Sequence, residues 1–436
     1  MAGGTFVTRN KVRAGAYINF VSEFSPLGTV SDRGVVLLPM ELPFGAVHTA
    51  VAVEGDTDVR KLFGLSALSD ELLLLREAAK RASRVLVWRL NGGETAQKTD
   101  SGLTVSARYP GSIGNTLAVK IIDPEDGSGV YYVQTFLGEK MVDEQEAEVI
   151  DSLKDNDWVT FSGTGALTPH AGIVLEGGSD EETDESDWED FFAAAARLTF
   201  NTMAVPTADK AIKQLAFSFV KRMREDEGVK IQAVVANMEA DYEGIISVYG
   251  GVVLEDGVSL SAAQATAYVA GMTAGAAVNK SCTYDRYDGA VSVERQLTAS
   301  EIIALLKAEH FLFIQRGSKV VVEQDINTFT SFTTEKGNAF RKNRTLRVMD
   351  SIGTDVRTIF EDYYLGKCAN DTDGRALFRE ELFSYLSQLY EVRAIEKLAI
   401  EDITVLRGET ADSVIVEMAV QPVDAMEKLY MNVTIK

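Results

Sequence analysis

DKAIKQLAFSFVKRMREDEGVKIQAVVAN, residues 209–237, places a helical pattern directly before the pattern of a buried strand. Over residues 209–228 apolar side chains recur every three or four positions, as they do on one face of an amphipathic helix. Residues 230–237 then form a short apolar run with β-branched residues, which is typical of a buried strand. Helices that alternate with such strands indicate an α/β layer domain.

The same alternation continues on both sides of this stretch. Further strands are expected at EGIISVYGGVVL (243–254), FLFIQ (311–315) and KVVVEQ (319–324), and further helices at residues 261–278 and 298–309. An earlier α/β portion contains a helix in SALSDELLLLREAAKRA (66–82) and a strand in RVLVWRL (84–90). These elements together predict the α/β body of the protein.

The sequence pattern changes near residue 96. Short alternating runs separated by Gly, Pro, Asp and Asn follow one another, and their spacing predicts a small inserted all-β module. The runs are LTVSARYPG (103–111), NTLAVKIIDP (115–124), GVYYVQTFLG (129–138), DWVTFSGTG (157–165) and AGIVLEGG (171–178). Nine of the 15 residues from 176 to 190 are then Asp or Glu, a pattern open to a cation site or to a solvated linker that enters a helix. Because no ligand spacing is evident, we favour the linker.

The C-terminal part is mainly helical and ends in strands. Residues 338–366 and 373–395 have the pattern of two long helices, and strands are expected in DITVLRG (402–408) and SVIVEMAVQP (413–422). The predicted fold class is therefore a multidomain α+β protein: an α/β body with an inserted all-β module, a helical C-terminal region and extended terminal β-arms. The expected divisions are an N-terminal arm strand (1–20), the first part of the body (21–95), the β-sandwich or barrel-like module (96–178), a second α/β domain (179–334), a C-terminal domain (335–427) and a C-terminal arm strand (428–436).

Composition excludes several functional classes. The 436 residues carry 43 Lys and Arg against 65 Asp and Glu, a formal charge of −22, which argues against direct binding of nucleic acid or of an anionic membrane. The uncharged stretch 257–279 is mostly Ala, Gly, Ser and Thr, so we expect a tightly packed helix and no membrane insertion. Cys282 and Cys368 are the only cysteines, and they are expected to be free thiols in a protein made in a reducing cytoplasm.

No catalytic constellation is evident. His48, His170 and His310 lie in unrelated contexts, and the sequence contains neither a GxSxG elbow nor a GxxxxGK[ST] phosphate loop. ANDTDGRALFRE (369–380) resembles a calcium loop, but its first position is Ala369, so we favour a polar turn that caps the next helix. We therefore predict a protein that is not an enzyme and has no catalytic residues, no cofactor and no metal.

The two ends of the chain have the alternation of half-buried strands. In KLYMNVTIK (428–436) the side chains of Leu429, Met431, Val433 and Ile435 share one face. Near the start, Ala16, Ile18 and Phe20 alternate with Tyr17 and Asn19. Such strands either form the edge of the protein's own sheet or add to the sheet of a neighbouring subunit. The absence of a catalytic site favours the second alternative, an assembly subunit.

The ordered set of motifs also resembles a known family, the tail sheath proteins of contractile phage tails and phage-tail-like bacteriocins. The resemblance spans essentially the whole chain and rests on RAGAYINF (13–20), PGSIGNTLAVKI (110–121), AGAAVNKSCTY (274–284) and GSKVVVEQDINTFTSFT (317–333). In RAGAYINF, Ala14 stands where a proline is common, which concerns the stiffness of the arm. A self-assembling capsid or surface-layer protein without contraction is the alternative.

The resemblance implies a homo-oligomer of stacked, hexameric rings around an inner tail tube, in contact with baseplate and tail terminator proteins. It places the protein in a virion or tail-like particle that is assembled in the cytoplasm of the bacterial host. Residues 12–20 and 428–436 would be the exchanged arms, with hinges near residues 21–28 and 421–425. Residues 335–420 would lie nearest the tube, and the inserted module would face outward. The basic residues Arg341, Lys342 and Arg344 are a candidate patch for contact with the tube or the stack.

Overall fold

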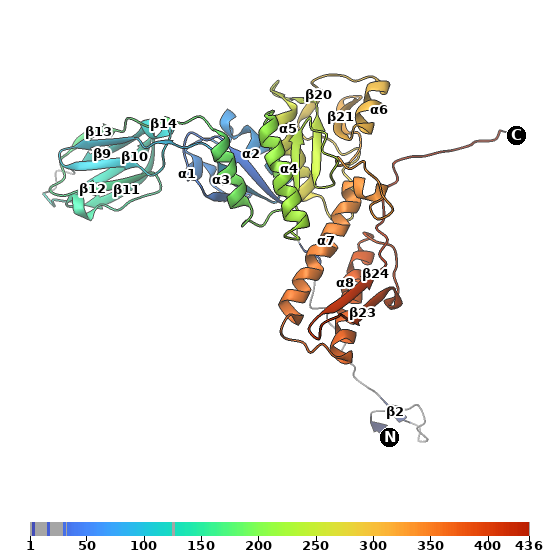
Figure 1. Cartoon of the computed structure of the whole chain (residues 1–436). Coiled ribbons are helices and arrows are strands. Elements are labelled where there is room, and N and C mark those ends of the chain that lie inside the picture. The colour runs from blue at the N-terminus through green and yellow to red at the C-terminus, as the bar shows by residue number, and fades with distance from the viewer. Residues whose placement is uncertain (1, 5–14, 18–28, 32, 124–126, 436) are drawn as a thin grey trace. The chain divides into compact units, whose positions relative to one another are not determined.

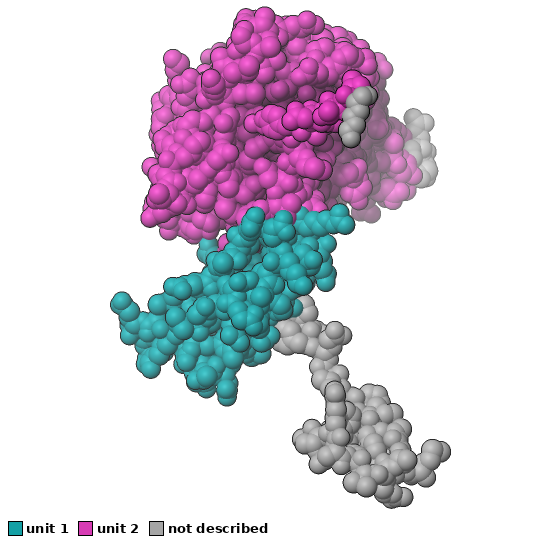
Figure 2. All heavy atoms as spheres, turned by 90° about the vertical axis from the view of Figure 1, so that its right-hand side faces the viewer, with its two compact units in different colours: residues 1–31, 355–421 teal, residues 32–354, 422–436 magenta. Residues whose placement is uncertain are grey.

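A computed structural model describes residues 2–4, 15–17, 29–31, 33–123 and 127–435 (Figure 1). The chain forms two compact units, coloured separately in Figure 2. Unit 1 comprises Met1–Ser31 and Asp355–Gln421, and unit 2 comprises Asp32–Thr354 and Pro422–Lys436. Helices and strands are mixed in both units, and the predicted multidomain α+β class is confirmed.

The centre of unit 2 is an eight-stranded sheet with the strand order β22-β21-β17-β16-β15-β3-β5-β4. Adjacent strands from β21 to β5 are parallel, and β22 and β4 add antiparallel edges. The bounds are β3 (Val35–Met40), β4 (Ala50–Val53), β5 (Arg84–Arg89), β15 (Thr202–Ala204), β16 (Gln232–Ala236), β17 (Ile245–Tyr249), β21 (His310–Arg316) and β22 (Lys319–Val322).

Helices cover both faces of this sheet. Along β3, Val36 and Leu38 enter the core that contains α2 (Leu73–Ala79) and α5 (Ala262–Gly275), because successive side chains point to opposite faces. Leu37 enters the other core, with α3 (Glu185–Ala195) and α4 (Lys210–Glu225). The helix and strand predicted from residues 209–237 are confirmed as α4 and β16.

The prediction of a single strand at residues 243–254 is wrong. β17 ends at Tyr249, and residues 252–254 form β18 (Val252–Leu254) in a second sheet with β19 (Ser259–Leu260) and β20 (Ala290–Val293). Gly250 has φ 74°, and a Cβ at Gly251 would lie 1.8 Å from the carbonyl oxygen of Leu260. The two glycines therefore break the strand and allow the chain to change sheets. The body also contains two short helices, α1 (Val59–Phe63) and η1 (Asp70–Leu72), and the longer helix α6 (Ala299–Lys307).

The uncharged stretch 257–279 forms the packed helix that its composition predicts. Eleven of the 14 residues of α5 are buried. Gly271 and Gly275 allow a neighbouring backbone to approach α5 closely. A Cβ at Gly271 would lie 2.2 Å from the carbonyl oxygen of Ala78, and a Cβ at Gly275 would lie 1.9 Å from that of Arg81. Among the described residues, no helix is long and apolar enough to cross a membrane.

The predicted all-β module is confirmed as a β-sandwich inserted after β5. One sheet has the order β11-β10-β9-β13 and the other β12-β8-β7, with apolar side chains between them. Phe44, from the body, also lies in this core, with its ring centroid 6.0 Å from that of Trp158. The bounds are β7 (Gln97–Asp100), β8 (Leu103–Ala107), η2 (Ser112–Thr116), β9 (Leu117–Ile122), β10 (Tyr131–Leu137), β11 (Lys140–Ala147), η3 (Ile150–Ser152), β12 (Val159–Gly163) and β13 (His170–Val174).

The chain enters and leaves the module through two adjacent strands. β6 (Gly93–Glu94) pairs antiparallel with β14 (Ser179–Asp180). The buried guanidinium of Arg89 donates to the carbonyl oxygens of Gly45, Pro110 and Gly92 at 3.1, 2.7 and 3.1 Å. Arg89, at the connection between the body and the module, therefore has polar contacts to both. After β14 the acidic run continues into α3, whose N-cap is Asp184, as the linker interpretation predicts.

Unit 1 is built on two helices and one hairpin. α7 (Asn343–Ile359) begins in unit 2, after η4 (Asn338–Arg341), and ends in unit 1 with a π-helical turn (Phe360–Tyr364). α8 (Thr372–Glu391) is capped by Asp371, whose carboxylate accepts a hydrogen bond from the backbone N–H of Gly374 at 2.8 Å, so the turn interpretation of residues 369–380 is supported. After η6 (Ile400–Asp402), β23 (Ile403–Arg407) and β24 (Val414–Met418) form an antiparallel hairpin beside α8 (Figure 1).

Candidate assembly interface

Among the described residues, no strand pairs with either outer edge of the β23–β24 hairpin. The register of the hairpin pairs Ile403 with Met418 and Arg407 with Val414. Two-stranded sheets are only marginally stable alone, and an open edge exposes unpaired N–H and C=O groups. Each edge can therefore accept one added strand of about 17 Å.

The two faces of the hairpin differ in exposure. Ile403 is buried at 1% exposure on the face that also carries Val405 and Val416. On the opposite face Leu406 and Ile415 are direct cross-strand partners and remain 49% and 44% exposed. An apolar pair of this kind gains free energy if a further element covers it.

The C-terminal residues 428–435 extend from unit 2 without a strand partner among the described residues (Figure 1). The predicted apolar face is exposed: Leu429 at 85%, Met431 at 72%, Val433 at 73% and Ile435 at 92%. Burying four such side chains would contribute roughly 6–12 kcal/mol, because each contributes about 1.5–3 kcal/mol. The described residues 428–435 form no strand in the isolated chain, so the arm strand that the alternation predicts stays a prediction.

The N-terminal arm lies mostly outside the described residues, including Ile18, Asn19 and Phe20. Ala16 and Tyr17 lie in β2 (Gly15–Tyr17), which pairs in parallel with β1 (Ala2–Gly4). The segment that follows is held at Ser31, which hydrogen-bonds the buried carboxylate of Asp355 through its backbone N–H at 3.3 Å and through its hydroxyl. Tyr385 in α8 donates its hydroxyl to the same carboxylate at 2.7 Å.

The candidate basic patch has contacts within its own chain. Lys342 forms an ion pair with Glu427, and their side chains are 16% and 10% exposed. Arg341 donates to the carbonyl oxygen of Leu306, at the end of α6. Arg344 is half-buried; burial lowers its pKa, and the nearby carboxylate of Asp424 opposes that shift. The three residues thus lie beside the segment that leads into the C-terminal arm, and no sequence pattern indicates Glu427 or Asp424 as their partners.

A buried ion pair lies directly beneath this segment. Arg347 donates to Asp325 at 2.7 Å, and both side chains are 1% exposed. Burial by itself would raise the pKa of Asp325, but Arg347 and hydrogen bonds from Cys282 and Asn343 keep this pKa below its ordinary value. The pair comes from segments with no evident relation in sequence, so pattern analysis could not find it.

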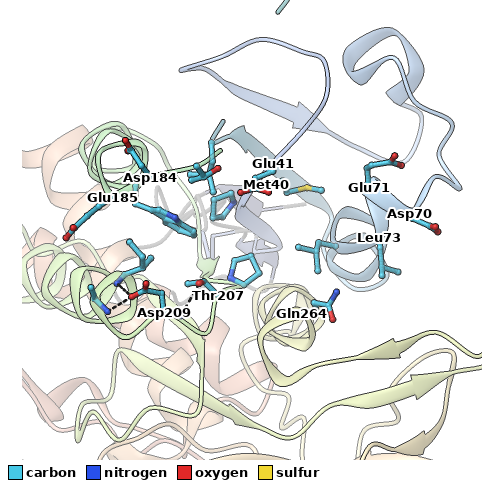
Figure 3. A pocket seen from close by; sticks show the side chains of 18 residues that line it. Met40, Glu41, Asp70, Glu71, Leu73, Asp184, Glu185, Thr207, Asp209 and Gln264 are labelled. Atoms are coloured by element: carbon cyan, nitrogen blue, oxygen red, sulfur yellow. Dashed lines mark hydrogen bonds between the residues drawn. The ribbon is translucent and has the colours of Figure 1, made fainter. Parts of the chain in front are cut away.

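A cleft of about 550 Å³ opens at the carboxyl ends of β3 and β15 (Figure 3). Met40, Leu73 and Trp188 contribute apolar surface to it. Its acidic residues are Glu41, Asp70, Glu71, Asp184, Glu185 and Asp209. Two of these carboxylates already cap helices: Asp184 caps α3, and Asp209 caps α4 by accepting from the N–H groups of Ala211 and Ile212 at 2.6 and 3.3 Å. Helix capping therefore accounts for part of the acidity of this cleft.

The described residues contain no group of three or more His, Cys, Asp or Glu side chains that could hold a metal ion. His48 precedes β4, His170 begins β13 and His310 begins β21, so the histidines do not converge. The Nδ1 atom of His310 lies 3.1 Å from the Ser247 hydroxyl, and burial lowers the pKa of this ring.

Four family models match consecutive parts of the chain. They describe the N-terminal region of tail sheath domain III (residues 33–90), the phage tail sheath β-sandwich domain (91–180), the central domain (181–328) and the C-terminal domain (335–436). The residues of the inserted module and of the hairpin thus fall within the sheath β-sandwich and C-terminal domain models, respectively.

Individual proteins match over the full length. A phage-like element PBSX protein, XkdK, of Bacillus subtilis is 37% identical, with 100% of both chains covered. The crystal structure of a sheath tail protein from Desulfitobacterium hafniense is 44% identical, with a TM-score of 0.84 over 97% of this chain and 100% of the other. The helical sheath of the anti-feeding prophage in its contracted state shares the fold at 12% identity, with a TM-score of 0.57 over 97% and 99% of the two chains.

Proposed function

This chain belongs to the phage tail sheath family, and from that premise we propose that it is the subunit of a contractile sheath. Subunits assemble as stacked hexameric rings around an inner tail tube. Contraction of the sheath drives this tube through a bacterial envelope. The family is one of structural proteins, and the proposed work comes from rearranged subunit contacts, not from catalysis.

The observation that supports this proposal is the combination of an open hairpin and an exposed alternating strand. The hairpin offers two edges, and each chain has two arms to donate. Residues 12–20 of one subunit and 428–436 of another complete a four-stranded sheet on the hairpin of a third. Such a head-to-tail contact is heterologous, so it closes into rings or continues as a helix.

Contraction then consists of rigid-body movement of subunits that remain linked by their arms. The extended sheath is metastable, and the contracted sheath gains subunit contacts. A difference of a few kcal/mol per subunit, about the size of ordinary conformational differences, adds up over the many copies of a sheath. Links beside the arms accommodate the movement; the sequence suggests them near residues 21–28 and 421–425.

The proposed partners follow from this position in the particle. The sheath surrounds the inner tube protein, contacts the baseplate at one end and meets a tail terminator protein at the other. The particle is a virion or a tail-like bacteriocin, assembled in the bacterial host cytoplasm. A self-assembling capsid or surface-layer protein would share the strand exchange but would not shorten.

Electron microscopy of the purified protein tests the proposal directly. We expect hollow striated cylinders that occur in a longer, thinner form and a shorter, wider form. A variant that ends at residue 427 keeps the hydrogen bonds of Glu427 to Thr283 and Lys342 and removes the donated strand. It should stay monomeric with the melting temperature of the full chain. Normal polymerisation of this truncated protein would refute strand donation, and cylinders of a single fixed length would favour the alternative.

A further inference from the structure

The segment of residues 424–427, which leads into the C-terminal arm, lies in a seat on unit 2 formed by three separate stretches of chain. These are residues 280–284, 323–324 and 338–344. Hollows of about 380 and 610 Å³ are both lined by Ala425, Met426 and Glu427, together with different parts of this seat. Within the segment Ala425 and Glu427 are partly buried against the body, whereas the side chain of Met426 and all residues from Lys428 to Ile435 are exposed.

Glu427 is the residue that attaches the segment to its seat. Its Oε1 accepts a hydrogen bond from the Thr283 hydroxyl at 2.8 Å, and its Oε2 accepts from the ammonium group of Lys342. The carboxylate is only 10% exposed, whereas the side chain of Leu429, two residues later, is 85% exposed. A charged side chain stays this buried only when both of its oxygens are satisfied, as they are here.

The attachment continues inward to the core of unit 2. The Thr283 hydroxyl accepts a hydrogen bond from the backbone N–H of Asp325 at 3.0 Å. The carboxylate of Asp325 is the one paired with the buried Arg347 of α7. Lys342 is also fixed through its backbone, which forms a β-bridge with Ile326. Glu427 is therefore connected to a buried polar network and not only to flexible surface side chains.

Charge complements these contacts. The lining of the seat carries Lys280, Arg341, Lys342 and Arg344 with one carboxylate, Glu323, and the segment carries Asp424 and Glu427. In a chain with a formal charge of −22, a concentration of basic side chains opposite an acidic segment fixes where that segment binds.

We propose that Glu427 anchors the C-terminal arm to unit 2, so that the movable part of the arm begins at Lys428. This inference rests on the proposed function, in which the arm is donated to another subunit. With this anchor, the hinge of the arm lies at Lys428, after Glu427, and not at residues 421–425, where the sequence suggested it. Force on a donated arm then reaches the Asp325–Arg347 pair and the sheet of unit 2, without passing through the helical unit 1.

Cleavage by a glutamyl endopeptidase tests the anchor on the unassembled protein. Cleavage after Glu427 releases the peptide 428–436, and cleavage after Glu409, an exposed residue between β23 and β24, serves as an internal reference. The protease must extract Glu427 from Thr283 and Lys342, so cleavage tracks the population of the open state. Lys342→Met and Thr283→Val should each raise the ratio of the two cleavages at least about tenfold, the change that corresponds to about 1.4 kcal/mol.

Lys336→Met is the matched control, because it removes a different lysine ion pair of unit 2, the one with Glu243. It should leave the ratio unchanged. A variant that merely unfolds raises both cleavages together, and the ratio separates that effect from release of the arm. If the ratio stays within about twofold of the original protein in both anchor variants, the arm is not anchored at Glu427. This result is independent of strand donation, which the truncation at residue 427 tests through assembly.

Discussion

Arg224 of α4 binds Asp350 of α7 with both ends of its guanidinium group. Nη1 and Nη2 donate to Oδ2 and Oδ1 at 2.8 and 2.7 Å, and the side chains are 5% and 10% exposed. This bidentate pair fixes the first part of α7 against the helical layer of the sheet. The position of α7 in unit 2 therefore depends on this pair together with the buried Arg347–Asp325 pair.

Replacing Arg224 by Met should lower the free energy of unfolding by about 3–5 kcal/mol, because Asp350 would remain buried without its partner. Arg222→Met in the same helix is the control. Its partner Glu227 is 45% exposed, and an exposed pair contributes at most about 1 kcal/mol. Urea denaturation followed by circular dichroism measures both variants. Equal midpoints for the two would contradict the role assigned to the buried pair.

Gly271→Ala should destabilise unit 2 by about 1–3 kcal/mol, because the new methyl group would lie 2.2 Å from the carbonyl oxygen of Ala78 and force α5 away from α2. Gly353→Ala is the matched substitution in α7, where the nearest atom would be 3.7 Å away in the side chain of Lys230. That substitution should stabilise the helix by up to about 1 kcal/mol. Thermal unfolding compares the two, and a shift of the same sign in both would show that helix propensity rather than close packing controls position 271.

Charged substitutions on the two faces of the C-terminal arm should separate assembly from folding. Met431→Lys and Val433→Lys place a charge on the face that is proposed to be buried in a neighbour, and they should abolish cylinders. Both side chains are more than 70% exposed in the isolated chain, so the melting temperature should not change. Thr434→Lys, on the opposite face, should still assemble. Electron microscopy provides the test, and cylinders formed by the Val433 variant would exclude this face as the buried one.

Stability should depend on pH through Glu309, which is 3% exposed. Burial raises the pKa of this carboxyl from 4.5 to about 7; Arg341 opposes the shift, and Asp241 and Glu239 add to it. The folded state therefore retains a proton that the unfolded state has lost, so the stability that this group contributes is present below pH 4.5 and is lost as the pH rises towards 7.

Glu309→Gln should remove this dependence and raise stability at pH 8 relative to pH 5 by on the order of 1–3 kcal/mol. Glu335→Gln, at an exposed glutamate, is the control and should behave as the original protein does. The measurement is the denaturation midpoint at several pH values. An unchanged slope in the Glu309 variant would mean that this carboxyl is charged throughout the range.

Sequence patterns predicted the elements whose burial follows a local period. α4 is predictable because each of its turns meets one core, and β16 because its alternate residues enter the cores on both faces of the sheet and so form a continuous apolar run. The break at Gly250 and Gly251 was missed, because the crowding that requires it comes from Leu260, whose position no local pattern reveals. Likewise, Arg341, Lys342 and Arg344 were recognised as a basic cluster, but Glu427 lies about 85 residues away from Lys342 and has no sequence signal as its partner.

The short β6–β14 pair has a consequence for engineering the protein. Because the module begins and ends at neighbouring positions, another domain can replace it. Rejoining the chain between Gly93 and Ser179 would not require the rest of the body to move. Side chains of the body would lose partners in such an exchange: the Phe44 ring would lose Trp158 and Tyr109 and would need a polar substitute, and Arg89 would lose the carbonyl oxygen of Pro110. With that replacement, a foreign domain of similar attachment could be displayed on every subunit along the particle.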